Sequence, residues 1–265
     1  MRITTKNIAL MAIFAALYYV LALIAPIQIP TGLGTLSIGF SAFLAAVMGV
    51  VLGPYLGAAS AFLGASLAWA LPPSSGSIFG LPFLLSPPIN AFLTGSIFYR
   101  KWKFGFAVFA LMIIAYLFTP PVQPLAENYP VAVAVLADKV VALLLILPIV
   151  FFAKHLSVAK ASLFYFLLFF VGNQADNMWG TLIFSTPPVY QGIFGLELDG
   201  TRFLLMVSPL LYPAVRIVQA IIGMIIAVPL MHALKGTPWL WRMDTVLSPE
   251  KESGTSVPAK TDGLQ

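Results

Sequence analysis

The sequence predicts an all-α protein, a polytopic bundle of about eight transmembrane helices within a range of six to eight, with both termini in the cytoplasm. Three observations predict this fold class. Hydrophobic residues make up 60% of the 265 residues and charged residues only 9%, which is too little polar surface for a soluble domain. The apolar residues come in long runs, and Lys and Arg gather between alternate runs.

Eight apolar ranges are candidates for spanning helices, because a helix pairs its own backbone groups in lipid and a span needs roughly 20 apolar residues. Pro209 and Pro213 are expected to bend the start of the last range, and the second, third and fifth ranges are short. The ranges are 8–25, 38–53, 55–71, 81–98, 104–119, 131–152, 161–185 and 203–234.

The positive charges indicate the orientation. Eleven of the fourteen Lys and Arg residues fall in segments that alternating helices place on one side: the amino terminus, the turns at 100–103 and 153–160, and the region after 234. The positive-inside rule makes that side cytoplasmic. Only Arg202 falls outside, and Lys139 and Arg216 lie within spans. The net charge of +5 therefore does not indicate nucleic-acid binding.

We expect one transmembrane domain over residues 1–247 and a disordered cytoplasmic tail over residues 248–265, whose composition is polar. Trp239, Trp241 and Arg242 are expected to anchor the chain at the interface before the tail. The chain contains no cysteine, which excludes disulfides and thiolate metal sites.

Small residues repeat at four-residue spacing in the first three ranges. The first range contains Ala12 and Ala16, and similar faces follow in the next two: Ala45, Gly49 and Gly53, then Gly57, Ala61 and Ala65. Such faces let helices approach closely in lipid. Two interpretations stay open, packing inside this chain and, for the first helix, contact with another subunit.

Pro-Pro pairs mark the predicted outer loops at 72–73, 87–88, 120–121 and 187–188. The pair at 87–88 lies inside an apolar run, so residues 72–88 form either a loop that enters the outer leaflet before a short helix or a simple kinked helix. Residues 116–123 also resemble residues 182–191, which suggests a duplication of the hairpins 104–152 and 161–234.

Polar residues inside the apolar ranges are the candidate functional residues, because an ionisable side chain in a span is costly. Asn173, Asp176, Asn177 and Gly180 share one helical face, and Trp179 could stack beside a ligand held there. Asn90, which follows a Pro-Pro pair, is expected to line the same cavity.

The last range offers a matching face with Arg216 and Gln219. Asp176 and Arg216 lie at similar depths below their outer helix ends, so we hypothesise an ion pair between them. The pair is either part of a ligand site or purely structural, each charge making the other tolerable.

Asp138 and Lys139 are adjacent, so we expect them to face different directions without pairing, with Lys139 reaching outwards and Asp138 as a secondary site candidate. His155 and His232 are expected to be solvated. Phosphate-binding, metalloprotease and hydrolase motifs are absent from the sequence, so we expect no catalytic residues, no metal site and no cofactor.

The first 103 residues resemble the substrate-binding (S) component of energy-coupling factor (ECF) transporters. The resemblance lies in the basic amino terminus, the first helix with Ala12-x-x-x-Ala16, the loop 26–37, the Leu-Gly-Pro-x-x-Gly turn at 52–57, and the end of the fourth range at 95–101. The segment 203–235 also resembles the last helix of that family.

The resemblance implies a small membrane protein that captures a vitamin or similar micronutrient from outside. It implies docking through Ala12 and Ala16 on a transmembrane coupling subunit that carries two ATPase subunits, with loops 26–37 and 72–88 acting as lids. The expected location is the plasma membrane of a prokaryote.

The sequence departs from this family in helix number, because the family has six helices and eight are counted here; an additional hairpin within 104–160 accounts for the difference. The expected ligand contacts are Asn90, Asn173, Asp176, Asn177, Trp179, Arg216 and Gln219. Two alternatives remain: a self-sufficient transporter coupled to H⁺ or Na⁺ through Asp176 or Asp138, and an intramembrane enzyme acting on lipids.

Overall fold

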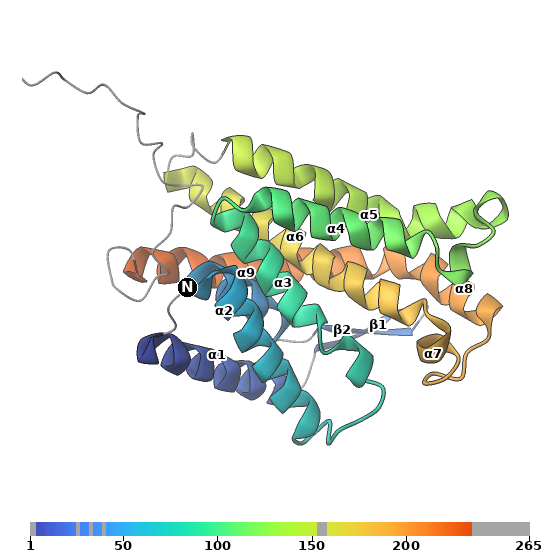
Figure 1. The fold of residues 1–265 in the computed structure, drawn as a ribbon, viewed down its shortest axis with the longest axis horizontal. Coiled ribbons are helices and arrows are strands. Elements are labelled where there is room, and N and C mark those ends of the chain that lie inside the picture. Colours follow the sequence, from blue (N-terminus) through green and yellow to red (C-terminus); the bar gives the residue numbers. More distant parts are fainter. Residues whose placement is uncertain (1–3, 25–26, 32–33, 39–40, 153–157, 235–265) are drawn as a thin grey trace, which may run out of the picture.

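The computed structural model describes residues 4–24, 27–31, 34–38, 41–152 and 158–234 (Figure 1). The main helices lie side by side in a bundle, and the start of α1 and the end of α9 lie at the same end of it (Figure 1). The long helices are α1 (Thr5–Leu23), α2 (Ala42–Ala70), α3 (Ser86–Phe98), α4 (Trp102–Tyr116), α5 (Leu125–Phe152), α6 (Val158–Phe184) and α9 (Tyr212–Leu234). The short elements are β1 (Ile27–Thr31), β2 (Gly34–Ile38), η1 (Leu81–Phe83), η2 (Pro120–Val122), α7 (Pro187–Tyr190), α8 (Leu198–Val207) and η4 (Ser208–Leu210).

The α2 helix consists of two halves that fold back on each other at Gly53. Gly53 has φ 82° and ψ 171°, a conformation that glycine adopts without steric cost, and Pro54 follows it. A Cβ added at Gly57 would lie 2.7 Å from the carbonyl oxygen of Met48, so only glycine allows the halves this close. The predicted tight turn between two short helices is therefore confirmed.

Small residues bring α2 against its neighbours on both sides. A Cβ at Gly49 would lie 2.2 Å from the carbonyl oxygen of Ala91 on α3, and one at Gly64 would lie 2.7 Å from Cβ of Tyr18 on α1. Ser60 Oγ donates a hydrogen bond to the Met11 carbonyl of α1 at 2.8 Å. The small residues of α2 therefore serve to pack helices within this chain.

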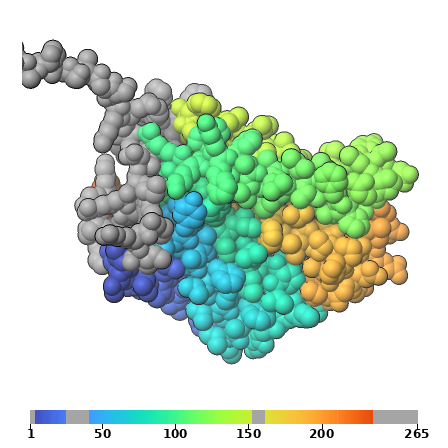
Figure 2. All heavy atoms as spheres, viewed as in Figure 1, coloured from blue at the N-terminus to red at the C-terminus, as the bar shows by residue number. Residues whose placement is uncertain are grey.

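The α6 helix lies in the middle of the bundle and packs against α3, α4, α5 and α9. At Gly223 of α9, an added Cβ would lie 2.8 Å from the ring of Phe169 on α6, which shows how closely these two helices approach. The α4–α5 hairpin runs along one side of the molecule and reaches the α7–α8 region at its far end (Figure 2).

The eight apolar ranges correspond to helical segments, with the second and third forming the two halves of α2. In the described residues, five segments are long and apolar enough to cross a membrane by length and composition alone: α1, α2, Leu81–Phe98, α5 and α9. Because α2 folds back at Gly53, it does not cross as one straight helix. The number of spans and the cytoplasmic position of the termini stay predictions. The tail, Trp239, Trp241 and Arg242 lie outside the described residues.

Three details differ from or refine the predicted helices. An antiparallel β-hairpin, with Ile27 paired to Ile38 and Thr31 to Gly34, lies in the region predicted as the loop 26–37, so the bundle is helical but this connection is not a plain loop. The range 203–234 is broken, as its prolines predict, into α8, η4 and α9. Pro87 and Pro88 lie in the first turn of α3, where proline is tolerated. Since η1 leads almost directly into that turn, the choice between a loop that enters the outer leaflet and a kinked helix stays a prediction.

The two similar stretches 116–123 and 182–191 also share local geometry. Thr119 and Thr186 each donate a side-chain hydrogen bond of 2.7 Å to the carbonyl three residues earlier, and each precedes a short Pro-Pro turn of helix, η2 or α7. Duplication of the larger hairpins stays a hypothesis.

Candidate ligand-binding site

A cavity of about 670 Å³ lies among α1, the start of α3, α6, α8 and the start of α9. Its volume is in the range of sites that enclose a small molecule. Segments that the sequence analysis placed near the outer side, among them η1 and α8, supply much of its wall. The lining residues are Tyr18, Ala42, Phe83, Ser86, Pro87, Asp176, Asn177, Gly180, Thr181, Phe184, Phe194, Leu204, Leu205, Val207, Ser208, Leu211, Tyr212 and Arg216.

The charged part of the cavity joins α6 to α9. Arg216 Nη2 lies 3.6 Å from Asp176 Oδ1, and both side chains are only 11% exposed. The predicted ion pair is therefore present. Arg216 Nη1 also donates a hydrogen bond of 2.9 Å to Gln219 Oε1 one turn further along α9. This hydrogen bond helps to fix the position of the guanidinium.

The helical period of α6 explains which of its residues reach this cavity. Asp176, Asn177 and Gly180 lie on one face and all line it, as does Thr181. Because Gly180 has no side chain, that face has room beside the charged pair: a Cβ there would meet nothing nearer than 3.7 Å.

Aromatic side chains also line the cavity. The Phe194 ring lies 5.4 Å from Phe184, 6.3 Å from Phe83 and 5.4 Å from Phe79, centroid to centroid. Such rings offer flat apolar surfaces to a planar ligand. The cavity thus combines a charged and amide-bearing end with an aromatic wall, the usual composition of a small-molecule site.

Sequence reasoning missed this aromatic wall and Tyr18. Phe83 and Phe184 are close in sequence to the Pro-Pro pairs at 87–88 and 187–188, and that proximity is the signal that could have found them. Tyr18 lies in an apolar helix among many similar residues, and nothing in its sequence context marks it.

Asn90 and Asn173 were expected to contact the ligand, but the structure places them in a separate polar network. Asn90 Nδ2 donates to Asn173 Oδ1 at 2.8 Å, and Thr94 Oγ1 donates to Asn90 Oδ1 at 3.2 Å. Asn90, Thr94 and Asn173 have no exposed surface, and the lining residues of the cavity do not include them. This network connects α3 to α6.

Two other predicted contacts also lie away from the cavity surface. Gln219 is buried and accepts the hydrogen bond from Arg216, so it supports the guanidinium. Trp179 is partly buried and does not line the cavity. Of the seven predicted ligand contacts, the structure brings together Asp176, Asn177 and Arg216 at the cavity.

The prediction for Asp138 and Lys139 was wrong. Lys139 Nζ lies 2.9 Å from Asp138 Oδ1, and Lys139 is 1% exposed instead of reaching outwards. The long, flexible Lys side chain curls back to its neighbour, which the spacing argument for helix faces did not consider. Neither residue lines the cavity.

On α1, Ala12 and Ala16 lie on the exposed side of the helix, next to the exposed Ile13 and Leu17, and Tyr18 reaches the cavity. The same helix therefore contributes to the cavity and presents a small-residue face outwards. In the residues described, we find no group of three or more His, Cys, Asp or Glu side chains that could hold a metal ion.

Comparison with known families agrees with this architecture. The model of the family "ECF-type riboflavin transporter, S component" matches residues 2–150, more than half of the chain. The protein belongs to this family of ECF transporter S components. A comparison with curated proteins gives no significant match.

The family assignment makes the protein a membrane-embedded, substrate-binding subunit of an ECF transporter. It is a family of transporter components and not of enzymes, and it does not favour the ion-coupled transporter as an alternative. The matched part contributes Tyr18, Phe83, Ser86 and Pro87 to the cavity, whereas Asp176 and Arg216 lie beyond it.

Proposed function

We propose that this S component captures a small water-soluble vitamin from outside a prokaryotic cell, with the cavity between α6 and α9 as its binding site. The observation that carries this proposal is the buried Asp176–Arg216 pair open to a cavity of about 670 Å³. Riboflavin is the first candidate, because it is the substrate in the description of the family.

The composition of the cavity supports a ligand with a flat ring and polar edges. Asp176 supplies hydrogen-bond acceptors and Arg216 supplies donors. The Asn177 amide supplies both, through its NH₂ group and its carbonyl oxygen. Phe184 and Phe194 offer apolar surface in the same cavity. A vitamin with a heteroaromatic ring could use both parts at once.

Binding of riboflavin to the purified full chain in nanodiscs, measured by equilibrium dialysis, tests the site. We expect Asp176→Asn to weaken binding at least about 30-fold, because truncating one partner of a buried charge pair costs about 2 kcal/mol or more. Glu127→Gln, the same change at an exposed carboxylate of α5, is the matched control and should bind as wild type does.

If riboflavin does not bind, the same assay is repeated with a panel of water-soluble vitamins. The proposal is contradicted if no member binds, or if a vitamin binds equally well to the wild type and to folded Asp176→Asn.

We further propose that the exposed face with Ala12 and Ala16 docks on a transmembrane coupling subunit, which in turn carries two ATPase subunits. The family implies such a module, and a face of small residues lets another helix approach closely. The lipid bilayer is the other partner that the apolar helices require.

A pull-down of the tagged chain from native membranes, with identification of co-purifying proteins, tests this docking. We expect a membrane subunit and ATPases with the wild type, and their loss in Ala12→Trp/Ala16→Trp. The control Val141→Trp/Leu144→Trp places the same bulk on exposed positions of α5. Purification of the wild type alone, or equal loss in both variants, would argue against docking through α1.

A further inference from the structure

One wall of the cavity is formed by residues 194–211, which run from the α7–α8 connection through α8 and η4. We call this segment the α8 wall. Phe194, Leu204, Leu205, Val207, Ser208 and Leu211 of this segment all line the cavity. Because α8 is only 10 residues long and lies between two short connections, its position depends on what holds it to the rest of the bundle.

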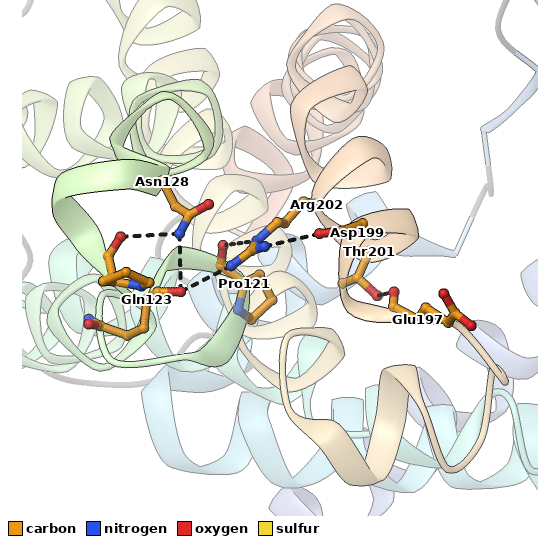
Figure 3. A network of polar contacts seen from close by, with 8 residues as sticks. Pro121, Gln123, Asn128, Glu197, Asp199, Thr201 and Arg202 are labelled. Atoms are coloured by element: carbon orange, nitrogen blue, oxygen red, sulfur yellow. Dashed lines mark hydrogen bonds and ion pairs between the residues drawn. The ribbon is translucent and has the colours of Figure 1, made fainter.

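Arg202 makes the polar attachment of the α8 wall (Figure 3). Its Nε donates to the Pro121 carbonyl at 3.1 Å, and its Nη2 donates to the Gln123 carbonyl at 3.0 Å. A third nitrogen, Nη1, lies 3.0 Å from Asp199 Oδ1 on α8 itself. Arg202 thus connects α8 to the turn between α4 and α5 with two charge-assisted hydrogen bonds.

The turn that accepts these hydrogen bonds is itself held in place. Asn128 Nδ2 donates to the carbonyls of Gln123 and Pro124, each at 3.1 Å (Figure 3). The α8 helix also packs against η2 and α5, and the α4–α5 hairpin and the α8 region meet at the molecular surface (Figure 2). A guanidinium suits this role because its fixed fork can donate to two carbonyls at once.

The opposite end of the α8 wall has a different kind of attachment. Phe194 contacts rings from three other segments, at 5.4–6.3 Å between centroids. Ring contacts tolerate small displacements better than hydrogen bonds do, because their energy varies slowly with geometry. Phe194 and Leu196 also donate backbone hydrogen bonds to Val189 and Tyr190 of α7, at 3.0 and 2.8 Å. The hydrogen bonds of Arg202 supply the directional attachment of α8 itself to the α4–α5 turn.

We propose that Arg202 is a positioning residue for the ligand site: it holds the α8 wall against the α4–α5 turn and so limits access to the cavity behind that wall. This proposal takes only the identity of the ligand from the proposed function. Arg202 does not line the cavity and acts through Leu205 and its neighbours.

The absence of cysteine from the chain allows a test that does not depend on the ligand. Thr181→Cys places a single thiol in the cavity, on α6 and not on the α8 wall. The rate at which a charged, water-soluble thiosulfonate modifies this thiol reports how accessible the cavity is from water. The rate is compared in the background of wild type, Arg202→Gln, Arg202→Lys and Asp199→Asn, each as the full chain in nanodiscs.

We expect Arg202→Gln to raise the modification rate at least about fivefold, because two charge-assisted hydrogen bonds are lost. Arg202→Lys keeps the positive charge but not the forked guanidinium, so its modification rate should lie between those measured with Arg202 and with Arg202→Gln. Asp199→Asn is the matched control: Asp199 has a 91% exposed side chain and touches Arg202 without reaching the turn, so the rate should stay near wild type.

Dissociation of bound riboflavin, used as the probe, should accelerate in the same order. Equal modification rates in Thr181→Cys alone and in Thr181→Cys combined with Arg202→Gln would overturn the proposal. So would equal acceleration by Asp199→Asn, or faster modification without faster riboflavin release. If the cysteine-free wild-type chain binds no riboflavin, the choice of that vitamin is contradicted, whereas the modification rates still decide the role of Arg202.

Discussion

The α6 helix carries two polar clusters one turn apart, and they differ in almost every respect. Asn173 accepts a hydrogen bond of 2.8 Å from Asn90, which in turn accepts one of 3.2 Å from Thr94, and this closed network has no exposed surface. Asp176 meets Arg216 at 3.6 Å beside a cavity of about 670 Å³. Polar residues in a membrane segment therefore mark either helix contacts or ligand sites, and the space around them distinguishes the two.

The glycines next to each cluster show the same difference. A Cβ added at Gly172 would lie 2.1 Å from Thr94 Oγ1 and 2.4 Å from Asn90 Oδ1. At Gly180 the nearest atom would be 3.7 Å away. The absence of a side chain at Gly172 lets two helices touch, whereas at Gly180 it leaves part of the cavity empty.

The largest effect is expected from breaking the charged cluster. Arg216→Gln leaves Asp176 as an unpaired buried charge and should destabilise the protein by about 3–5 kcal/mol. The double variant Asp176→Asn/Arg216→Gln removes both charges and should regain most of that stability, but not ligand binding. Thermal unfolding midpoints and equilibrium dialysis measure the two properties. A double variant as unstable as the single one would contradict this account of the pair.

The next largest difference is expected when each of the two glycines is replaced, because the two clusters should then lose different amounts of stability. Gly172→Ala forces apart the network between α3 and α6 and should cost about 1–3 kcal/mol. Gly180→Ala meets no close contact and should change the stability by no more than about 0.5 kcal/mol. Unfolding midpoints of the two variants, each made in the wild-type chain, provide the measurement. Equal destabilisation by both substitutions would show that α6 is packed equally tightly at Gly172 and at Gly180.

A smaller effect is expected from the closed network itself. Asn173→Ala leaves the Asn90 amide without its acceptor and should cost about 1–2 kcal/mol of stability. Ligand affinity should stay within about threefold, because Asn173 does not line the cavity. Asn177→Ala should have the converse effect: it should lower the affinity for the ligand and leave the stability nearly unchanged. Strong loss of binding in folded Asn173→Ala would place the closed network in the ligand site.

The smallest effect is expected at the aromatic wall. Phe194→Leu keeps apolar volume but removes the ring that contacts Phe184 and Phe83. Ring contacts contribute about 0.5–1.5 kcal/mol beyond buried area, so affinity should fall about two- to tenfold. Titration of the vitamin that binds wild type measures this change. An unchanged affinity would mean that the ligand does not reach Phe194.

Periodicity and depth predicted the helices and the Asp176–Arg216 contact, because both follow from regular geometry along one chain. They could not predict which neighbour each face meets. Asn90 and Asn173 lie at suitable positions for a ligand site, yet Gly172 lets their helices come together and close the gap. The conformation of Lys139 was missed for a related reason, since a flexible side chain is not confined to the face of its Cα.

The fold of α2 has a consequence for the order in which the protein is assembled. Its first half, Ala42–Leu52, has an axial length of roughly 16 Å, about half of the hydrocarbon thickness of ~30 Å. Residues Phe43 to Leu52 are all buried in the finished structure, and Gly49 lies against Ala91 of α3. Because this half precedes α3 in the chain, we expect it to pack beside the second half of its own helix before α3 becomes available. Gly53 and Pro54, which fold the halves together, would then be needed during membrane insertion as well as in the final bundle.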